Sequence, residues 1–200
     1  MKWEVREPFY APDLYYTHEC HDLFKMGDWW YLIFSEFTDR VRTRYRMSRS
    51  LKGPWTAPVR DDFDGHAFYA AKTASDGNKR FIFGWNPTRE GGKDNGDWNW
   101  GGNLVVHEIH QEDNGYLTVR VPESVADAFN KPVNFAFNTG TDNFQAKDGV
   151  VKIDASGTFG AASAGKMPAT CKINATVEFD KQTRECGLML RTDNDLEKSY

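Results

Sequence analysis

Cysteine is scarce in this sequence, and long apolar runs are missing from it. The three cysteines are Cys20, Cys171 and Cys186, and their spacing matches no zinc motif. Nothing in the sequence requires Cys171 to pair with Cys186, and nothing forbids it. No apolar run reaches the roughly 20 residues that a membrane-spanning helix needs. The sequence therefore predicts no metal, no cofactor and no membrane partner.

An excess of positive charge is missing too. The net charge is -4, and Lys and Arg are scattered along the chain, which argues against nucleic acid as a partner. Aromatic residues, in contrast, make up 14% of the chain. A β-rich core explains such an excess, and so does a carbohydrate partner, because sugar C–H groups pack on flat rings.

Local patterns predict short β-strands over most of the first 125 residues. Each is rich in aromatic or branched residues and is bounded by turn signals. A short helix is predicted at 125–129, and a long loop at 86–102, where Gly, Asn and Trp gather. Loops of that length are usually functional. The predicted strands are 22–26, 29–36, 42–49, 66–72, 80–85, 103–111 and 116–121.

A weak internal repeat connects the first strands with the later ones. Lys25 and Lys72 each precede a turn, and Ile33 and Ile82 lie in the strands that follow. These pairs are separated by 47 and 49 residues. Several short strands per unit and no helix are typical of β-propeller blades, although any β-meander produces a similar pattern.

The composition changes after Lys131-Pro132, where Trp becomes rarer and Ala, Thr and Lys more common. We expect a domain boundary there, with a partial propeller over 1–125 and a second domain over 126–200. Alternating strands predicted at 150–154, 171–179 and 187–191 are typical of a β-sandwich, of which they supply about half. The fold class predicted is therefore all-β. We expect the first domain to be incomplete at its start and the second at its end.

Acidic and histidine side chains crowd together just before the strand at 29–36. His18, Glu19, His21 and Asp22 fall within five positions. Acid groups at the start of a strand, supported by a stiff sheet, are one way in which enzymes present a proton donor. The alternative is a solvated, polar strand entry. His18 and His21 supply two metal ligands without a third, so no metal site is predicted.

Several motifs together resemble those of glycoside hydrolase family 32, the invertases, levanases and inulinases. Residues 19–24 are similar to its Glu-Cys-Pro-Asp-Leu-Phe motif, with His21 where Pro is usual. The other matches fall in the family's order along the chain. They are Phe-Tyr-Ala at 68–70, Gly-Trp at 84–85, Trp-Gly-Gly at 100–102 and the blade ending Gly-Pro-Trp at 53–55.

The resemblance implies a fold and a set of roles. It implies a five-bladed β-propeller followed by a β-sandwich, with Glu19 as the general acid/base. Trp85 matches a position that lines the sugar pocket, or it is a core residue of its strand. Tyr69 either bonds near the acid/base or fills the core, and Asp22 either contributes to the substrate site or accepts backbone N–H groups. His66 is expected to be a structural histidine.

One part of the family pattern is missing. A retaining glycosidase needs a second carboxylate as nucleophile. The family carries it in an Asn-Asp-Pro motif and a stabilising Asp in an Arg-Asp-Pro motif, and neither tripeptide occurs here. The sequence thus predicts part of a fructosidase acting on sucrose or fructans and inactive alone. The alternatives are a non-catalytic carbohydrate-binding module and a related propeller glycosidase acting on arabinan or xylan.

Overall fold

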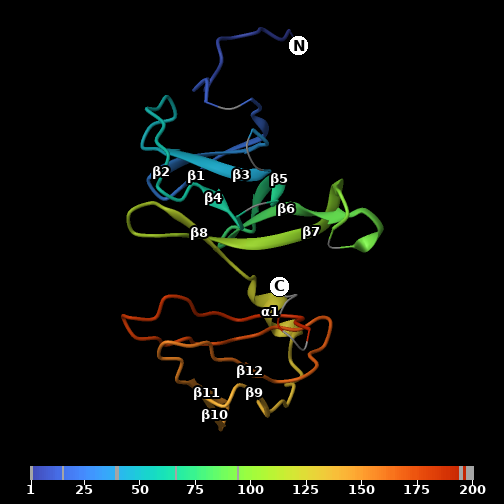
Figure 1. Ribbon diagram of the computed structural model, residues 1–200. Helices are drawn as coiled ribbons and strands as arrows, with labels where there is room; N and C mark the ends of the chain where they lie inside the picture. Colours follow the sequence, from blue (N-terminus) through green and yellow to red (C-terminus); the bar gives the residue numbers. More distant parts are fainter. Residues whose placement is uncertain are drawn as a thin grey trace. The chain divides into compact units, whose positions relative to one another are not determined.

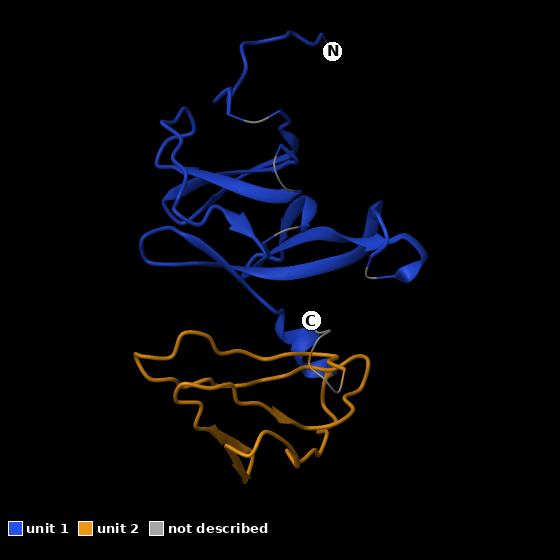
Figure 2. Cartoon of the chain, viewed as in Figure 1, with its two compact units in different colours: residues 1–128 blue, residues 129–200 orange. Residues whose placement is uncertain are grey.

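The chain forms two compact units, residues 1–128 and residues 129–200, and each is described here by itself (Figure 2). The structure is a computed structural model that describes residues 2–14, 16–38, 41–65, 67–93, 95–193 and 196. His66 therefore lies outside the described residues. The division falls after Ala128. The boundary expected from composition lay three residues earlier.

The first unit consists of two four-stranded antiparallel sheets, each with its strands in chain order (Figure 1). The predicted all-β, antiparallel character of this region is confirmed. No parallel strand pair occurs in the described part of the unit. The first sheet contains β1 (Glu19–Met26), β2 (Trp29–Glu36), β3 (Arg42–Ser48) and β4 (Asp62–Phe63). The second contains β5 (Tyr69–Ser75), β6 (Arg80–Arg89), β7 (Trp98–Gln111) and β8 (Leu117–Arg120).

The long loop predicted at 86–102 is mostly strand. β6 continues to Arg89 and β7 begins at Trp98, so that a short connection containing the 3₁₀ turn η1 (Glu90–Gly92) is left between them. The Gly and Pro signals mark an irregular pairing here rather than a loop. The register shifts between Pro87 and Arg89. A side chain at Gly102 would collide with the backbone of Asn86, so glycine lets the two strands stay paired.

The two sheets repeat one layout at an offset of 50 residues. Glu19 pairs with Ser35 at the start of the first sheet, and Tyr69 pairs with Trp85 at the start of the second. The predicted offsets of 47 and 49 are therefore wrong. They aligned residues of the same type, whereas the repeat is defined by which backbone positions pair. Ile33 corresponds to Phe83, not to Ile82.

An apolar cluster joins the two sheets. Tyr31 and Ile33 of β2 and Ile82 of β6 have no exposed surface. Gly84 belongs to the same region, because a Cβ atom there would lie 2.5 Å from the Phe68 ring. The contact thus requires glycine at this position of the Phe-Gly-Trp strand. The buried members are Phe24, Tyr31, Ile33, Tyr45, Met47, Phe63, Phe68, Ala71, Ile82, Ile109 and Leu117.

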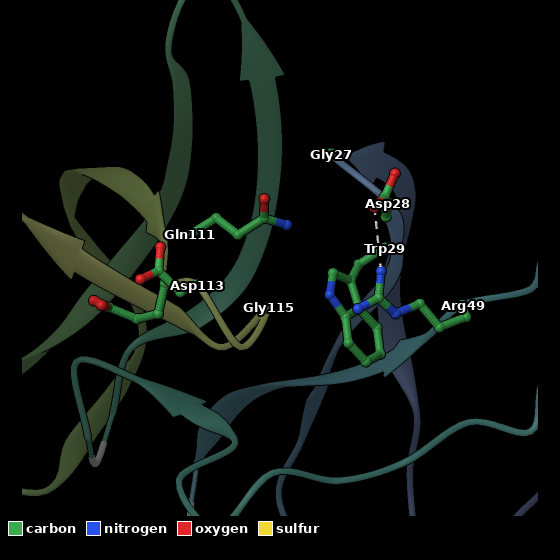
Figure 3. Close-up of a pocket in the computed structure, with 8 residues that line it drawn as sticks. Gly27, Asp28, Trp29, Arg49, Gln111, Asp113 and Gly115 are labelled. Carbon is green, nitrogen blue, oxygen red and sulfur yellow. Dashed lines mark hydrogen bonds and ion pairs between the residues drawn. The ribbon is translucent and has the colours of Figure 1, made fainter.

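Polar contacts connect the turn ends of the two sheets beside an open hollow of about 260 Å³ (Figure 3). Gln111 Nε2 donates to the Met26 carbonyl at 2.8 Å and to the Tyr31 hydroxyl at 2.5 Å. Tyr31 in turn donates to the Gly115 carbonyl at 2.6 Å. The Arg49 guanidinium lies 4.0 Å from the ring centre of Trp29. None of the predicted site residues lines this hollow.

The second unit contains little regular structure in its described part. β10 (Phe144–Lys147) pairs with β11 (Val150–Ile153), and β12 (Ala162–Ser163) pairs with β9 (Thr139–Gly140). The strand predicted at 150–154 is confirmed by β11. Those predicted at 171–179 and 187–191 are wrong, because no segment of the described residues pairs with them. The β-sandwich remains a prediction.

The helix predicted at 125–129 is α1 (Glu123–Ala128), which begins two residues earlier. The amides of Val125 and Ala126 both donate to the Pro122 carbonyl, at 3.0 and 2.9 Å. Proline therefore opens the first turn as its missing N–H allows. In the described residues, no helix has the length and apolar character that a membrane crossing requires.

Candidate functional site

Glu19 and Tyr69 meet across the two sheets. The Tyr69 hydroxyl donates to Glu19 Oε2 at 2.7 Å, although the residues are 50 positions apart in the chain. Tyr69 is fully buried and Glu19 half-buried. Burial, followed by the neighbouring Glu19 carboxylate, raises the pKa of Tyr69 well above its usual range. The phenol therefore keeps its proton and remains the donor to this carboxylate.

A β-bulge follows each of these two residues. The pairing of β1 with β2 is interrupted between Glu19 and Asp22, and that of β5 with β6 between Tyr69 and Lys72. The residue after each is left-handed without being glycine, with φ of 54° at Cys20 and 53° at Ala70. Such a conformation costs about 1–2 kcal/mol per residue. Bulges often re-aim a side chain beside an active site, and here both serve the same contact.

Aromatic rings extend from this contact. The Tyr69 ring lies 5.5 Å from Trp85 and 5.4 Å from Trp100, and the two indoles lie 5.3 Å apart, all edge to face. Trp100 is 73% exposed, so it offers solvent a flat apolar surface next to the buried Tyr69 and the half-buried Trp85. Trp100 was not predicted as a site residue, although it belongs to the Trp-Gly-Gly motif at 100–102. Its place among small and polar residues at 96–103 was the available signal.

Asp22 does not join the ring group directly. Its Oδ2 accepts the backbone N–H of Thr73 at 2.7 Å and the Thr73 hydroxyl at 2.6 Å. These bonds fit the interpretation that Asp22 accepts backbone N–H groups. Of the four predicted residues, Glu19, Tyr69 and Trp85 lie together. Asp22 lies nearby, where β1 contacts Thr73 of β5. Their functional roles remain predictions.

A buried charge network lies on the other face of the first sheet. Asp61 binds two guanidinium groups, Arg44 at 2.8 Å and Arg46 at 2.5 Å, and Arg44 also binds Glu36 at 2.8 Å. Glu36 has no exposed surface and Arg46 is only 2% exposed. Arg46 further donates to the Tyr10 hydroxyl at 3.0 Å. The alternation at 42–49 thus indicated the strand correctly but gave no sign that charges are buried on it.

His18 lies beside this network. Its ring is 4.5 Å from that of Phe34. Burial lowers the pKa of His18, and His21 and Arg46 lower it further, while Glu36 acts in the opposite direction. No group of three His, Cys, Asp or Glu side chains suited to a metal ion occurs among the described residues. All three cysteines are free thiols.

His18 should make the chain less stable in mild acid. Its pKa in the folded state is below that of the unfolded chain, about 6.5, so the unfolded state binds more protons as the pH falls through that value. Linkage then lowers the free energy of unfolding. We expect His18→Gln to reduce the stability lost between about pH 7.5 and 5, measured by urea unfolding.

The effect should stay well below the limit of about 1.4 kcal/mol per pH unit for one proton, because His18 is partly exposed. His110, an exposed histidine on β7, provides the control. The stability of His110→Gln at each pH gives the comparison for loss of a surface histidine. An identical pH dependence in wild type and His18→Gln would contradict the assignment.

The chain matches no protein-family model and no curated protein sequence. Among solved structures it is similar to the crystal structure of an exo-1,5-α-L-arabinanase from a bovine ruminal metagenomic library. The TM-score is 0.39 and the identity 14%, over 52% of this chain and 38% of that enzyme. The chain thus corresponds to well under half of the enzyme's length. The resemblance to glycoside hydrolase family 32 remains a prediction.

Proposed function

We propose that this chain is part of the catalytic region of a glycoside hydrolase, with Glu19 as the general acid/base. The observation that carries the proposal is the Glu19–Tyr69 hydrogen bond at 2.7 Å, surrounded by Trp85 and Trp100. A half-buried carboxylate beside exposed aromatic surface is what a glycosidase needs to hold a sugar ring and protonate its leaving oxygen.

In this mechanism the two oxygens of Glu19 have different tasks. Oε2 accepts the Tyr69 hydroxyl, which leaves Oε1 for the substrate. Glu19 donates its proton to the glycosidic oxygen as that bond breaks, and a second carboxylate attacks the anomeric carbon. Glu19 then takes a proton from the water that releases the sugar. The net reaction adds one water molecule across the glycosidic bond.

The larger fold belongs to the same proposal. Two four-stranded antiparallel sheets with one repeated layout agree with two neighbouring blades of a five-bladed propeller. The partial propeller over 1–125 and the start of a β-sandwich over 126–200 are proposed on this ground and on the family resemblance.

Two kinds of glycan are candidate substrates. The motif resemblance favours fructosides such as sucrose or fructans. The name of the solved arabinanase agrees instead with the alternative of an arabinan- or xylan-acting enzyme. A non-catalytic carbohydrate-binding role is the second candidate, because the sequence lacks the Asn-Asp-Pro tripeptide in which glycoside hydrolase family 32 carries the second carboxylate.

Oligosaccharide binding tests the proposal on the 200-residue chain itself. We expect fructo-, arabino- or xylo-oligosaccharides to change the tryptophan fluorescence, without release of reducing sugar. Trp100→Ala should weaken binding at least about tenfold, since burying an aromatic face contributes roughly 1.5–3 kcal/mol. Trp3, which is 91% exposed, supplies the matched control Trp3→Ala. Failure of all three sugars to bind would overturn the proposal.

A further inference from the structure

We propose that Asp22 and Thr73 form a clamp that positions Glu19 against Tyr69, which makes Asp22 a positioning residue rather than a sugar ligand. The inference rests on the proposed function, since it concerns the same carboxylate. The two bulges leave the positions of Glu19 and Tyr69 without support from regular strand pairing.

The bulges separate Glu19 and Tyr69 from the regular pairing of their own sheets. β1 returns to register only at Asp22, and β5 only at Lys72. A bulge disrupts the ladder locally and bends its strand. The ladders alone therefore do not fix the 2.7 Å separation between the Tyr69 hydroxyl and Glu19 Oε2. Contacts between β1 and β5 have to fix it.

Such contacts occur immediately after each bulge. Both donors of Thr73 reach one oxygen of Asp22, at 2.7 and 2.6 Å. Hydrogen bonds to a charged acceptor are about twice as strong as neutral ones. Lys72 Nζ adds a bond to the His21 carbonyl at 2.5 Å. The two strands are thus connected at the first positions where each regains its register.

The clamp is anchored to the core. Arg80 of β6 donates to the Thr73 hydroxyl at 2.7 Å, which orients that hydroxyl toward Asp22. The same guanidinium lies 4.2 Å from the ring centre of Phe24, a buried residue of β1. Asp22, Thr73, Arg80 and Phe24 therefore form a closed circuit of contacts that begins and ends on β1, the strand of Glu19.

The same contacts occupy one oxygen of Asp22, Oδ2. Its half-buried carboxylate accepts two bonds from Thr73. A sugar hydroxyl that competed for that oxygen would weaken the contact that holds Glu19 in place. A positioning role needs no such competition.

The Tyr69 hydroxyl proton reports on the clamp without any sugar. In ¹H NMR it is the slowly exchanging signal that disappears in Tyr69→Phe. We expect Thr73→Val to make this proton exchange with solvent about tenfold faster, because a hydrogen bond that supports the contact is lost. Thr73→Ser keeps the hydroxyl and should restore the wild-type rate. Ser75→Ala removes an exposed hydroxyl from the same strand and should have no effect.

Asp22→Asn provides a second variant, because it removes the charged acceptor and keeps the shape. It should accelerate the exchange as Thr73→Val does. An unchanged rate in folded Asp22→Asn or Thr73→Val would overturn the positioning role. A chain that binds oligosaccharide and shows that result retains the proposed function without the clamp. Clamp-dependent exchange in a chain that binds no sugar overturns only the proposed function.

Discussion

We expect Glu19→Gln to lower kcat on natural glycosides by about 10²–10⁴-fold, the usual contribution of general acid catalysis. The measurement needs a form of the protein that also supplies the second carboxylate. Glutamine keeps the shape of Glu19 and an oxygen that accepts the Tyr69 hydroxyl, so the aromatic surface should bind sugar as before. The loss should fall on kcat rather than KM, because the missing proton is needed in the transition state.

Comparing two substrates with different leaving groups distinguishes an acid role of Glu19 from a structural one. A nitrophenyl glycoside needs little protonation to depart, so Glu19→Gln should slow its first step less than that of the natural sugar. Glu112, an exposed acid after β7, provides the control Glu112→Gln, which should leave both rates unchanged. Equal losses on both substrates would argue against an acid role. No loss on either would make Glu19 a structural residue.

Asp61→Asn should destabilise the first unit by about 3–5 kcal/mol, as removal of one partner from a buried ion pair usually does. Asp61 is the carboxylate that Arg44 and Arg46 share, and both guanidinium groups are mostly buried. The variant keeps the shape of the side chain and removes its charge. Urea unfolding measures the difference in free energy.

An exposed pair in the connections of the same sheet supplies the control for Asp61→Asn. Asp28 and Arg49 are 3.4 Å apart, and their side chains are 88% and 60% exposed. Asp28→Asn should change the free energy of unfolding by no more than about 1 kcal/mol. If both variants lower the free energy of unfolding equally, burial does not make the charge of Asp61 more important than that of an exposed carboxylate.

The sequence predicted the strands of the first unit because each strand carries its own signal. The apolar run over 29–36 and the alternation over 42–49 are visible without any partner, although most residues of both strands are buried on either face. The contact between Glu19 and Tyr69 was predicted only through the family resemblance. It depends on two bulges and on the packing of separate sheets, which no local pattern encodes.

The wrong and missing predictions have one physical origin. Residues 171–179 alternate like a strand, yet a strand also requires a neighbour to pair with. Residues 86–102 carry loop signals, yet glycine at 102 allows an irregular hairpin to continue there. The buried charge of Arg46 was invisible because its partner Asp61 lies on the segment beyond β3. In each case the missing information concerns a second segment of the chain.

The shared geometry of Glu19 and Tyr69 has an evolutionary consequence. The two residues occupy the same position of a 50-residue repeat. After duplication of this repeat, one ancestral site would occur twice, with its two copies facing each other. Divergence of one copy to a carboxylic acid and of the other to a phenol would then yield an acceptor and its donor without any change of backbone. Insertions in the connection between the two sheets would not disturb this pair as long as the contacts between β1 and β5 are kept.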